Sequence, residues 1–328
     1  MSKQSPDRNF ALELVRVTEA AALAAARWQG RGDKEAGDQA AVDAMRLILS
    51  TIEMDGVVVI GEGEKDEAPM LYNGEAIGTG HPPAVDIAVD PIDGTRLLAE
   101  GRPGSLSVLA MAPRDTMFDP GPCVYMEKVV VGPDAVGVVD MDAPVIENLS
   151  AIAKAKGKEV RDLTVIMLER DRHEDLKRQI REAGARLDLI TDGDVAAAVL
   201  AAWDERPVDV LIGIGGTPEG VTAACAVKAL GGEILGRLWP RNDLERAAAE
   251  EAGYDLTRVL TTDDLVRTED CFFVCTGITE GQLVEGVTFD GKGAVTESLV
   301  MRSKSGTIRL VRARHRLNKL REYAAIDY

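Results

Sequence analysis

AVDIAVDPIDGTR, at residues 84–96, is the segment that decides the fold. Its apolar, β-branched start predicts a buried strand that delivers Asp90, and the proline that follows ends the strand because it has no N–H to donate. Asp93, Gly94 and Thr95 come next, and glycine permits a tight turn with a close backbone approach. A helix that begins here would point its free N–H groups toward whatever the carboxylates face. A divalent cation on Asp90 and Asp93 beside a phosphate explains this pairing, and a helix-capping turn is the simpler alternative.

The segments on either side show helical and then strand periodicity. Apolar residues recur at helical spacing over residues 12–28 and 38–52, with a polar loop at 30–38 between them. From about residue 145 helix and strand patterns alternate, which predicts βαβ units and a layered α/β fold. Strands are expected at residues 57–60, 84–89, 105–111, 124–131, 163–168, 187–191 and 208–212.

Length and charge narrow the class of protein. The 328 residues suit one large unit or two fused halves, which we expect to meet near 132–145 as residues 1–140 and 141–328 around one shared active site. The 55 acidic residues outnumber 38 Lys and Arg residues, so the net charge is −17 and a nucleic-acid partner is not expected. An acidic protein that handles an anionic substrate needs metal ions or a local basic patch.

The chain also shows no membrane or secretion signal. Its longest apolar run, residues 195–203, is about half the length of a membrane span. Asp7, Glu13 and Glu19 interrupt the region where an export signal needs an apolar core. Four cysteines in this length give no disulfide framework. We therefore expect a cytoplasmic protein without a membrane partner.

Two further strand ends present carboxylates. In VVVIGEGEKDEAP, residues 57–69, Glu62 and Asp66 belong to a group of four acids that repel one another unless they are solvated or bound to metal. The turn GIGGTPEG, residues 213–220, holds Glu219 near a helix start. Helix capping and a metal or substrate contact are both open alternatives for Glu219.

The turn ITDGDVAA, residues 190–197, adds Asp192 and Asp194, for which a helix N-cap and contacts to sugar hydroxyls are the alternatives. Asp38 adds a carboxylate from the N-terminal loop. Hard oxygen ligands favour Mg²⁺ or Mn²⁺ over zinc, and the chain has only three histidines for a zinc site. Several carboxylates around two hard cations are typical of metal-assisted phosphoryl hydrolysis.

One stretch departs from the acidic composition. Residues 302–321 carry eight Arg or Lys residues and no acid. The favoured interpretation is a solvated or subunit-contact face. The alternative is that one or two of these cations neutralise a phosphate.

These motifs together resemble one enzyme family. DPIDGT at 90–95 resembles the signature of the lithium-sensitive, metal-dependent sugar phosphatases, and GRGDK, GEGEKDEAPMLY and GIGGTPEG narrow the resemblance to the bacterial class II fructose-1,6-bisphosphatases. The resemblance implies a layered α/β/α/β/α sandwich. It also implies metal-dependent hydrolysis of the 1-phosphate of fructose 1,6-bisphosphate to fructose 6-phosphate in gluconeogenesis. The alternative substrates are sedoheptulose 1,7-bisphosphate and an inositol phosphate. A non-catalytic protein that senses sugar phosphates is the alternative from a different functional class.

The resemblance assigns site residues motif by motif. It implies two ions, Mn²⁺ or Mg²⁺, in the N-terminal half, with sugar and distal-phosphate contacts in the C-terminal half. A closed homo-oligomer, dimer or tetramer, is expected independently, because most soluble oligomers are of this kind. The implied metal ligands are Asp38 and Glu62 for one ion and Asp90, Asp93 and Glu219 for the other. The implied substrate contacts are Gly94 and Thr95 for the 1-phosphate, Asp93, Tyr125, Asp192, Gly193, Asp194 and Gly216 for the sugar region, and the Arg170, Asp171, Arg172 segment for the distal phosphate. The implied catalytic residues are Lys34, Asp66 and Thr95.

Overall fold

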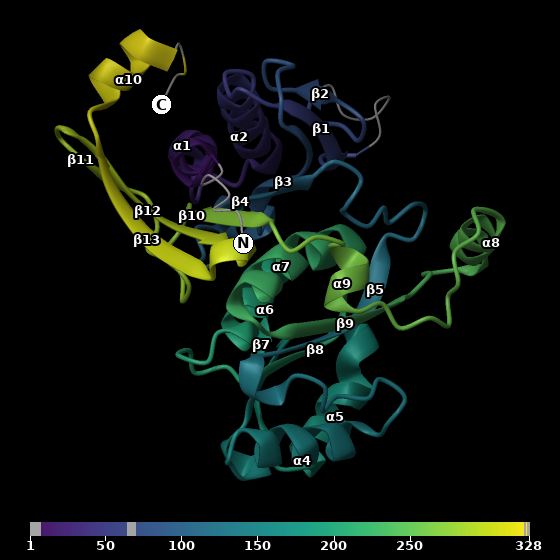
Figure 1. Cartoon of the computed structure of the whole chain (residues 1–328). Helices are drawn as coiled ribbons and strands as arrows, with labels where there is room; N and C mark the ends of the chain where they lie inside the picture. Colours follow the sequence, from purple (N-terminus) through teal and green to yellow (C-terminus); the bar gives the residue numbers. More distant parts are fainter. Residues whose placement is uncertain (1–7, 64–69, 325, 327–328) are drawn as a thin grey trace, which may run out of the picture.

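The computed structural model describes residues 8–63, 70–324 and 326, which form two β-sheets with helices around and between them (Figure 1). The first sheet runs in the order β11-β12-β10-β4-β3-β1-β2, with β13 paired to β12. Its strands are β1 (Asp55–Ile60), β2 (Ala76–Ile77), β3 (Ala84–Asp93), β4 (Leu106–Pro113), β10 (Phe272–Gly277), β11 (Thr288–Asp290), β12 (Gly293–Arg302) and β13 (Thr307–His315).

The second sheet has five strands in the order β7-β6-β8-β5-β9. Strands β6, β7 and β8 run parallel, and β5 runs antiparallel to both β8 and β9. The strands are β5 (Tyr125–Val131), β6 (Thr164–Leu168), β7 (Arg186–Ile190), β8 (Val210–Gly216) and β9 (Glu233–Leu238).

Helices complete five layers. Helices α1 (Ala11–Ala25) and α2 (Lys34–Leu49) cover the outer face of the first sheet, and α6 (Asp194–Ala202) and α7 (Thr217–Leu230) lie between the sheets (Figure 1). Helices α4 (Val145–Ala155) and α5 (Glu174–Glu182) cover the outer face of the second sheet. This α/β/α/β/α order confirms the expected fold class. The remaining helices are α3 (Thr95–Glu100), α8 (Asp243–Glu251), α9 (Thr262–Leu265) and α10 (Leu317–Ala324).

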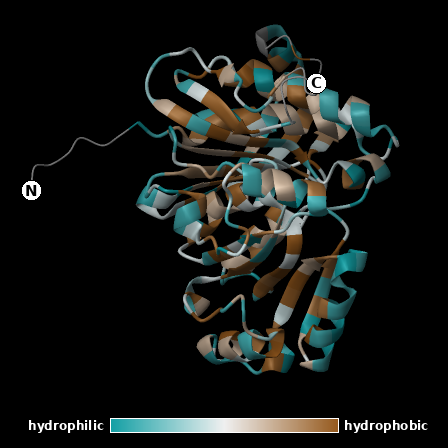
Figure 2. Ribbon diagram, turned by 90° about the vertical axis from the view of Figure 1, so that its right-hand side faces the viewer, coloured by the Kyte–Doolittle hydropathy of each residue, from teal (hydrophilic) through white to brown (hydrophobic). Residues whose placement is uncertain are grey.

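Small and aliphatic side chains build the interior. Twelve of the 15 residues of α1 are buried, and the helix is rich in alanine. Small side chains let the helix lie close to the sheet, which suits a chain with only 4% aromatic residues. The inner strands of both sheets, such as β4 and β8, are correspondingly apolar (Figure 2), whereas the outer strand β13 is exposed or half-buried along its length.

Two local expectations were wrong. Helix α2 begins at Lys34, inside the expected loop 30–38, because the Asp33 carboxylate accepts a hydrogen bond from the Ala36 N–H at 3.0 Å and caps the helix. Strand β3 continues past Pro91 to Asp93. The register with β4 shifts between Asp90 and Asp93, so the proline lies in a bulge, where no ladder hydrogen bond is required of it.

The sheets do not follow the order of the chain. Strand β5 belongs to the second sheet, although it precedes residue 140, and β10 to β13 return to the first sheet from the C-terminal part. The division into residues 1–140 and 141–328 therefore stays a prediction.

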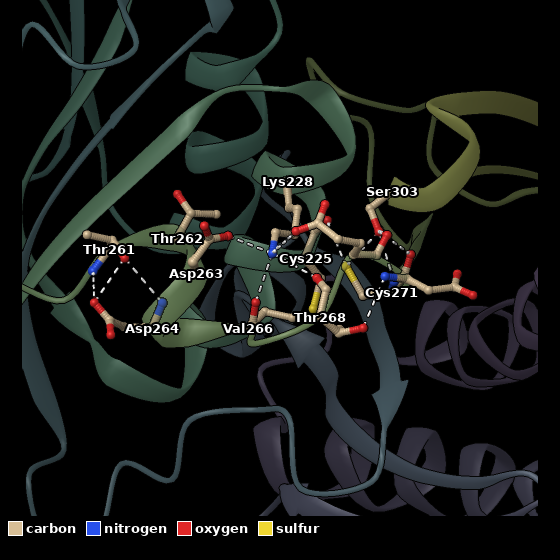
Figure 3. Close-up of polar contacts among 12 residues, drawn as sticks. Cys225, Lys228, Thr261, Thr262, Asp263, Asp264, Val266, Thr268, Cys271 and Ser303 are labelled. Atoms are coloured by element: carbon tan, nitrogen blue, oxygen red, sulfur yellow. Dashed lines mark hydrogen bonds and ion pairs between the residues drawn. The ribbon is translucent and has the colours of Figure 1, made fainter.

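Helix α7, which carries Glu219 at its start, is anchored at its other end by Lys228 (Figure 3). The Lys228 ammonium donates to the carbonyls of Val266 at 3.0 Å and Thr268 at 2.7 Å, and it pairs with Asp263 at 2.7 Å. These contacts fix α7 to the segment between β9 and β10.

All four cysteines are buried and free of disulfides, as expected. Among the residues described, none of the helices combines the length and the apolar character that crossing a membrane requires.

Candidate active site

The second sheet opens a crevice between β6 and β8. The chain passes from β6 through α5 to β7 on one side of β6, then returns through α6 to β8 on the other side. Ligands of open α/β sheets bind at such a switch point, beyond the carboxyl ends of the strands. The predicted residues of the segments 170–172 and 192–194 follow β6 and β7, and Gly216 ends β8, whereas Tyr125 begins β5 and Asp93 ends β3.

A pocket of about 190 Å³ lies at this crevice. It brings together residues that come from both sheets and that the sequence singled out separately. The predicted residues that line it are Asp93, Tyr125, Arg170, Arg172, Asp192, Gly193, Asp194, Gly216 and Glu219. None of residues 302–321 lines this pocket, so the pocket lends no support to a phosphate role for the basic stretch.

The bulge of β3 positions the residues from the first sheet. The Asp90 Oδ1 atom accepts the Ile92 N–H at 3.1 Å, which turns the strand end, and Gly94 follows with φ of +87°. A side chain at Gly94 would be strained at that angle. Thr95 is the first residue of α3, and its hydroxyl donates to the Ile92 carbonyl at 3.1 Å. The local sequence thus folds into the tight strand-to-helix turn that it predicted.

The N-terminal segment lies against this turn. Gly30 and Gly32 donate their N–H groups to the carbonyls of Leu98 and Ala99 at 2.9 Å, so the loop before α2 is tied to α3. Helix α2 then presents Asp38, whose carboxyl shares a hydrogen bond with that of Glu62.

Lys34 is exposed at the first position of α2. Asp66 lies outside the described residues.

The carboxyls form one repulsive group. Burial, followed by the charge and the hydrogen bond of Asp38, raises the pKa of Glu62 to about 7. Burial also raises the pKa of Asp90 well above its usual value, and so do the charges of Asp93 and Glu219. Burial, and then the charge of Asp194, raise the pKa values of Asp93 and Glu219 in turn. These groups need either protons or cations to stay together.

The donor set fits hard divalent cations. It consists of carboxylate oxygens, and the buried Oδ2 atom of Asp93 has no hydrogen-bond partner. Over residues 8–63, 70–324 and 326, no three acidic, histidine or cysteine side chains are arranged as a ready cation site. Of the predicted ligands, Asp93 and Glu219 line the pocket, whereas Asp38, Glu62 and Asp90 do not line it. The charges of Asp38 and Glu62 still raise the pKa of Asp90, and a cation would relieve this repulsion.

Two arginines line the same pocket as these carboxylates. Arg170 donates to the Thr191 carbonyl at 2.7 Å and lies 3.6 Å from the Asp192 carboxylate. Arg172 donates to the Ile214 carbonyl at 2.7 Å, and its guanidinium lies 5.0 Å from the centre of the Tyr125 ring. Asp171, between them, is exposed and does not line the pocket.

The sequence analysis missed Lys128. This side chain is 2% exposed, on β5, and its ammonium donates to the Gly216 carbonyl at 3.1 Å and lies 2.7 Å from Asp194 Oδ2. A signal was present: in YMEKVVV, residues 125–131, the lysine falls on the same strand face as the buried Met126 and Val130. A charge at an inward position of an apolar strand indicates a buried partner.

Comparison with known proteins identifies one enzyme family. A family model described as bacterial fructose-1,6-bisphosphatase, glpX-encoded, matches residues 8–315. The fructose-1,6-bisphosphatase 1 class 2 of Escherichia coli strain K12 is 45% identical over 325 residues, which are 95% of this chain and 96% of that protein. The class 2 enzymes of Escherichia coli O6:H1 and Shigella flexneri match to the same extent. A solved structure titled as an extragenic suppressor from Pyrococcus furiosus is 12% identical in sequence, with a TM-score of 0.29. The match covers 58% of this chain and 68% of that chain.

The fold and the site define a metal-dependent phosphatase of the layered α/β type. The chain belongs to the bacterial class 2 fructose-1,6-bisphosphatase family, which confirms the resemblance found in its motifs.

Proposed function

We propose that this protein hydrolyses the 1-phosphate of fructose 1,6-bisphosphate to give fructose 6-phosphate and inorganic phosphate, as a step of gluconeogenesis. The observation that carries the proposal is one pocket whose lining combines the carboxylates of Asp93 and Glu219 with the guanidinium groups of Arg170 and Arg172. Such a pocket suits a substrate with two phosphates, one that needs cations and one that binds guanidinium groups directly.

The arginine end orients the substrate. Arg170 and Arg172 would hold the 6-phosphate, since a guanidinium presents several donors to phosphate oxygens. Tyr125, Asp192 and Asp194 would accept or donate hydrogen bonds to the sugar hydroxyls, together with the backbone at Gly193 and Gly216. Asp171 would contribute only as part of its segment, because its own side chain is exposed.

The carboxylate end would hold two divalent ions, Mn²⁺ or Mg²⁺. We assign Asp38 and Glu62 to one and Asp90, Asp93 and Glu219 to the other. When bound, the ions would neutralise phosphate oxygens and lower the pKa of bound water. The N–H groups of Gly94 and Thr95 would hold the 1-phosphate.

The proton chemistry rests on residues beside the β3 turn. The Thr95 hydroxyl gives its hydrogen to the Ile92 carbonyl, so its oxygen is available to accept a hydrogen bond from the attacking water. Glu62 is one candidate to take the proton that the water loses. Asp66 is the second candidate for that role, and Lys34 would stabilise the charge of the reacting phosphate.

Phosphate release from fructose 1,6-bisphosphate, with Mg²⁺ or Mn²⁺ added, tests the proposal. We expect release that EDTA abolishes and that Asp90→Asn abolishes as well. Asp175→Asn, at an exposed helical position on α5, is the matched control and should retain full activity. No release from folded protein with either metal would overturn the proposal, and release only from sedoheptulose 1,7-bisphosphate or an inositol phosphate would reassign the substrate.

We also propose a cytoplasmic location and a dimer or tetramer. Exposed apolar side chains such as Leu310 on the outer strand β13 are suitable for a subunit contact. Light scattering coupled to gel filtration would test the oligomer, and a monomeric mass would contradict it.

A further inference from the structure

His173 fills the gap where β6 and β8 separate. The two strands pair only at Val165 with Val210 and at Ile166 with Leu211. Beyond this point the His173 ring, which is 1% exposed, connects them. Its Nδ1 lies 2.7 Å from the Leu168 carbonyl at the end of β6, and its Nε2 lies 2.8 Å from the Ile214 backbone nitrogen in β8.

The strand opposite the ring is built to receive it. Gly213 precedes Ile214 and has φ of +151°. A Cβ at Gly213 would lie 3.1 Å from the Cε1 atom of His173, which is tighter than ordinary contact. A glycine therefore lets β8 approach the imidazole closely.

The two hydrogen bonds fix the protonation state of the ring. A carbonyl can only accept, so Nδ1 must carry the hydrogen that goes to Leu168. A backbone N–H can only donate, so Nε2 must be unprotonated to accept from Ile214. A second proton would set two donors against each other at 2.8 Å.

The surroundings agree with a neutral ring. Burial lowers the pKa of His173, and the charges of Arg172, Arg170 and Lys177 lower it further, while the bond to Leu168 acts in the opposite direction. Lys128 and Asp194, which pair with each other, line the small space beside the ring.

The ring also determines where Arg172 lies. The Ile214 N–H donates to His173, and the carbonyl of the same residue accepts from Arg172 Nη2 at 2.7 Å and Nε at 3.3 Å. Ile214 is thus held by two neighbouring side chains of one short segment. Because that segment is tied to β8 through the ring, the Arg172 guanidinium stays at the pocket wall and beside Tyr125.

We propose that His173 is a positioning residue for the distal phosphate: its neutral, Nδ1-protonated ring locks Arg172 onto β8. The inference rests on the proposed function, since it requires a bisphosphate whose distal phosphate meets Arg172. The ring does not line the pocket, so its loss reaches the substrate only through the residues that it holds, of which Arg172 is the one that meets the distal phosphate. The affected quantity is therefore KM for substrates with a distal phosphate.

Steady-state kinetics with two substrates tests the proposal. Fructose 1,6-bisphosphate has the distal phosphate, and fructose 1-phosphate lacks it. We expect His173→Leu to raise KM for the bisphosphate about ten- to a hundredfold, the effect of losing one hydrogen bond to a charged group. KM for the monophosphate and both kcat values should stay within about threefold of wild type, because chemistry occurs at the other end of the pocket.

Two further variants make the test specific. His173→Asn keeps a donor near the Nδ1 position and should recover part of the affinity. His81→Gln removes an exposed histidine and should change neither KM value. Equal changes in KM for both substrates, or a fall in kcat alone, would overturn the positioning role.

A direct measurement covers the case in which His173→Leu does not fold. ¹⁵N NMR of the imidazoles in the wild-type protein, which has only three histidines, reports the tautomer of each ring. We expect one buried ring to be neutral and protonated at Nδ1 at pH 7. An Nε2-protonated or charged His173 would overturn the inference. Wild-type protein that hydrolyses neither substrate would overturn the proposed function and the inference with it, whereas an unchanged KM ratio in active variants would overturn the inference alone.

Discussion

The Lys128 ammonium lies 2.7 Å from the Asp194 carboxylate inside the protein, with both side chains less than 10% exposed. The pair lies against Gly215 of β8, where a Cβ would come within 1.9 Å of Asp194 Oδ2 and 2.8 Å of Lys128 Cε. The positive charge also opposes the repulsion that raises the pKa of Glu219. Lys128 is therefore a fixed counter-charge within the carboxylate cluster.

Replacing Lys128 by Met should destabilise the protein and weaken substrate binding. Removing one partner of a buried ion pair costs about 3–5 kcal/mol, because the other charge stays buried without compensation. Urea unfolding at pH 7 measures the stability, and KM for fructose 1,6-bisphosphate measures the binding through Asp194. Lys156→Met is the matched control, since its ion pair with Asp204 is 2.9 Å long but more exposed and lies outside the pocket. A Lys128→Met protein with wild-type stability and KM would contradict this role.

The sequence predicts much of the site because local patterns produce it. The apolar run before Asp90, the glycine at position 94 and the acids at the ends of β1, β7 and β8 all depend on short segments. Each acidic strand end could be identified from its own segment. Because parallel strands place their carboxyl ends at the same edge of a sheet, the sequence also suggests that these acids lie close together.

Long-range contacts account for what the sequence leaves out. Strand β5 pairs with β8 and β9, 79 or more residues further along, so no local pattern assigns it to the second sheet. Lys128 acquires its role only through that pairing, which brings it to Asp194 and Gly216. His173 likewise depends on the separation of β6 and β8. The bulge at Pro91 depends on the register with β4, which the segment 84–96 alone does not contain.

We expect the metal-free wild-type protein to be less stable than the variant Asp93→Asn, because the clustered carboxylates repel one another. Asp93 has a raised pKa and an unpartnered Oδ2, so its ionised form costs folding free energy at neutral pH. We expect Asp93→Asn to raise the unfolding free energy in EDTA by about 1–3 kcal/mol, since an amide removes the repulsion. Mn²⁺ should raise the melting temperature of the wild type through binding to the folded state and should raise that of Asp93→Asn much less.

Thermal unfolding with and without EDTA measures both effects. Asp175→Asn, at an exposed position, should behave as the wild type does under both conditions. A variant at Asp93 that is less stable than the wild type in EDTA would mean that this carboxyl has a stabilising partner in the metal-free protein.

Glu19 on α1 should give the protein a pH-dependent stability independent of the active site. Burial raises its pKa from 4.5 to about 7, while the hydrogen bond from Thr296, at 3.2 Å, opposes that rise. The folded state then binds a proton that the unfolded chain has released, so this part of the stability is full below about pH 4.5 and is lost as the pH rises through 7. Burial lowers the pKa of the nearby His315, whose contribution has the opposite sign.

The comparison of Glu19→Gln with the wild type isolates the glutamate. Between pH 5 and pH 8 the difference in unfolding free energy should move in favour of the variant by roughly 2–3 kcal/mol, because glutamine carries no charge to bury. Urea titrations at several pH values measure it, with the exposed Glu159→Gln as the control. A difference that stays constant across this range would show that Glu19 has the same pKa in the folded and unfolded states.

Thr95→Ala tests the part of the mechanism that depends on one hydroxyl group. In the structure this hydroxyl donates to the Ile92 carbonyl at 3.1 Å, so its oxygen remains available to accept a hydrogen bond from the attacking water in the proposed mechanism. Removing it should lower kcat about 10²- to 10⁴-fold, the range for a lost proton-transfer group, while KM changes by less than about threefold. Thr95→Ser keeps the hydroxyl and should retain most of the rate. The melting temperature of both variants should stay near that of the wild type, because a single hydrogen bond contributes only about 1 kcal/mol. A raised KM with unchanged kcat in Thr95→Ala would instead make Thr95 a substrate-binding residue with no part in the transfer of the proton.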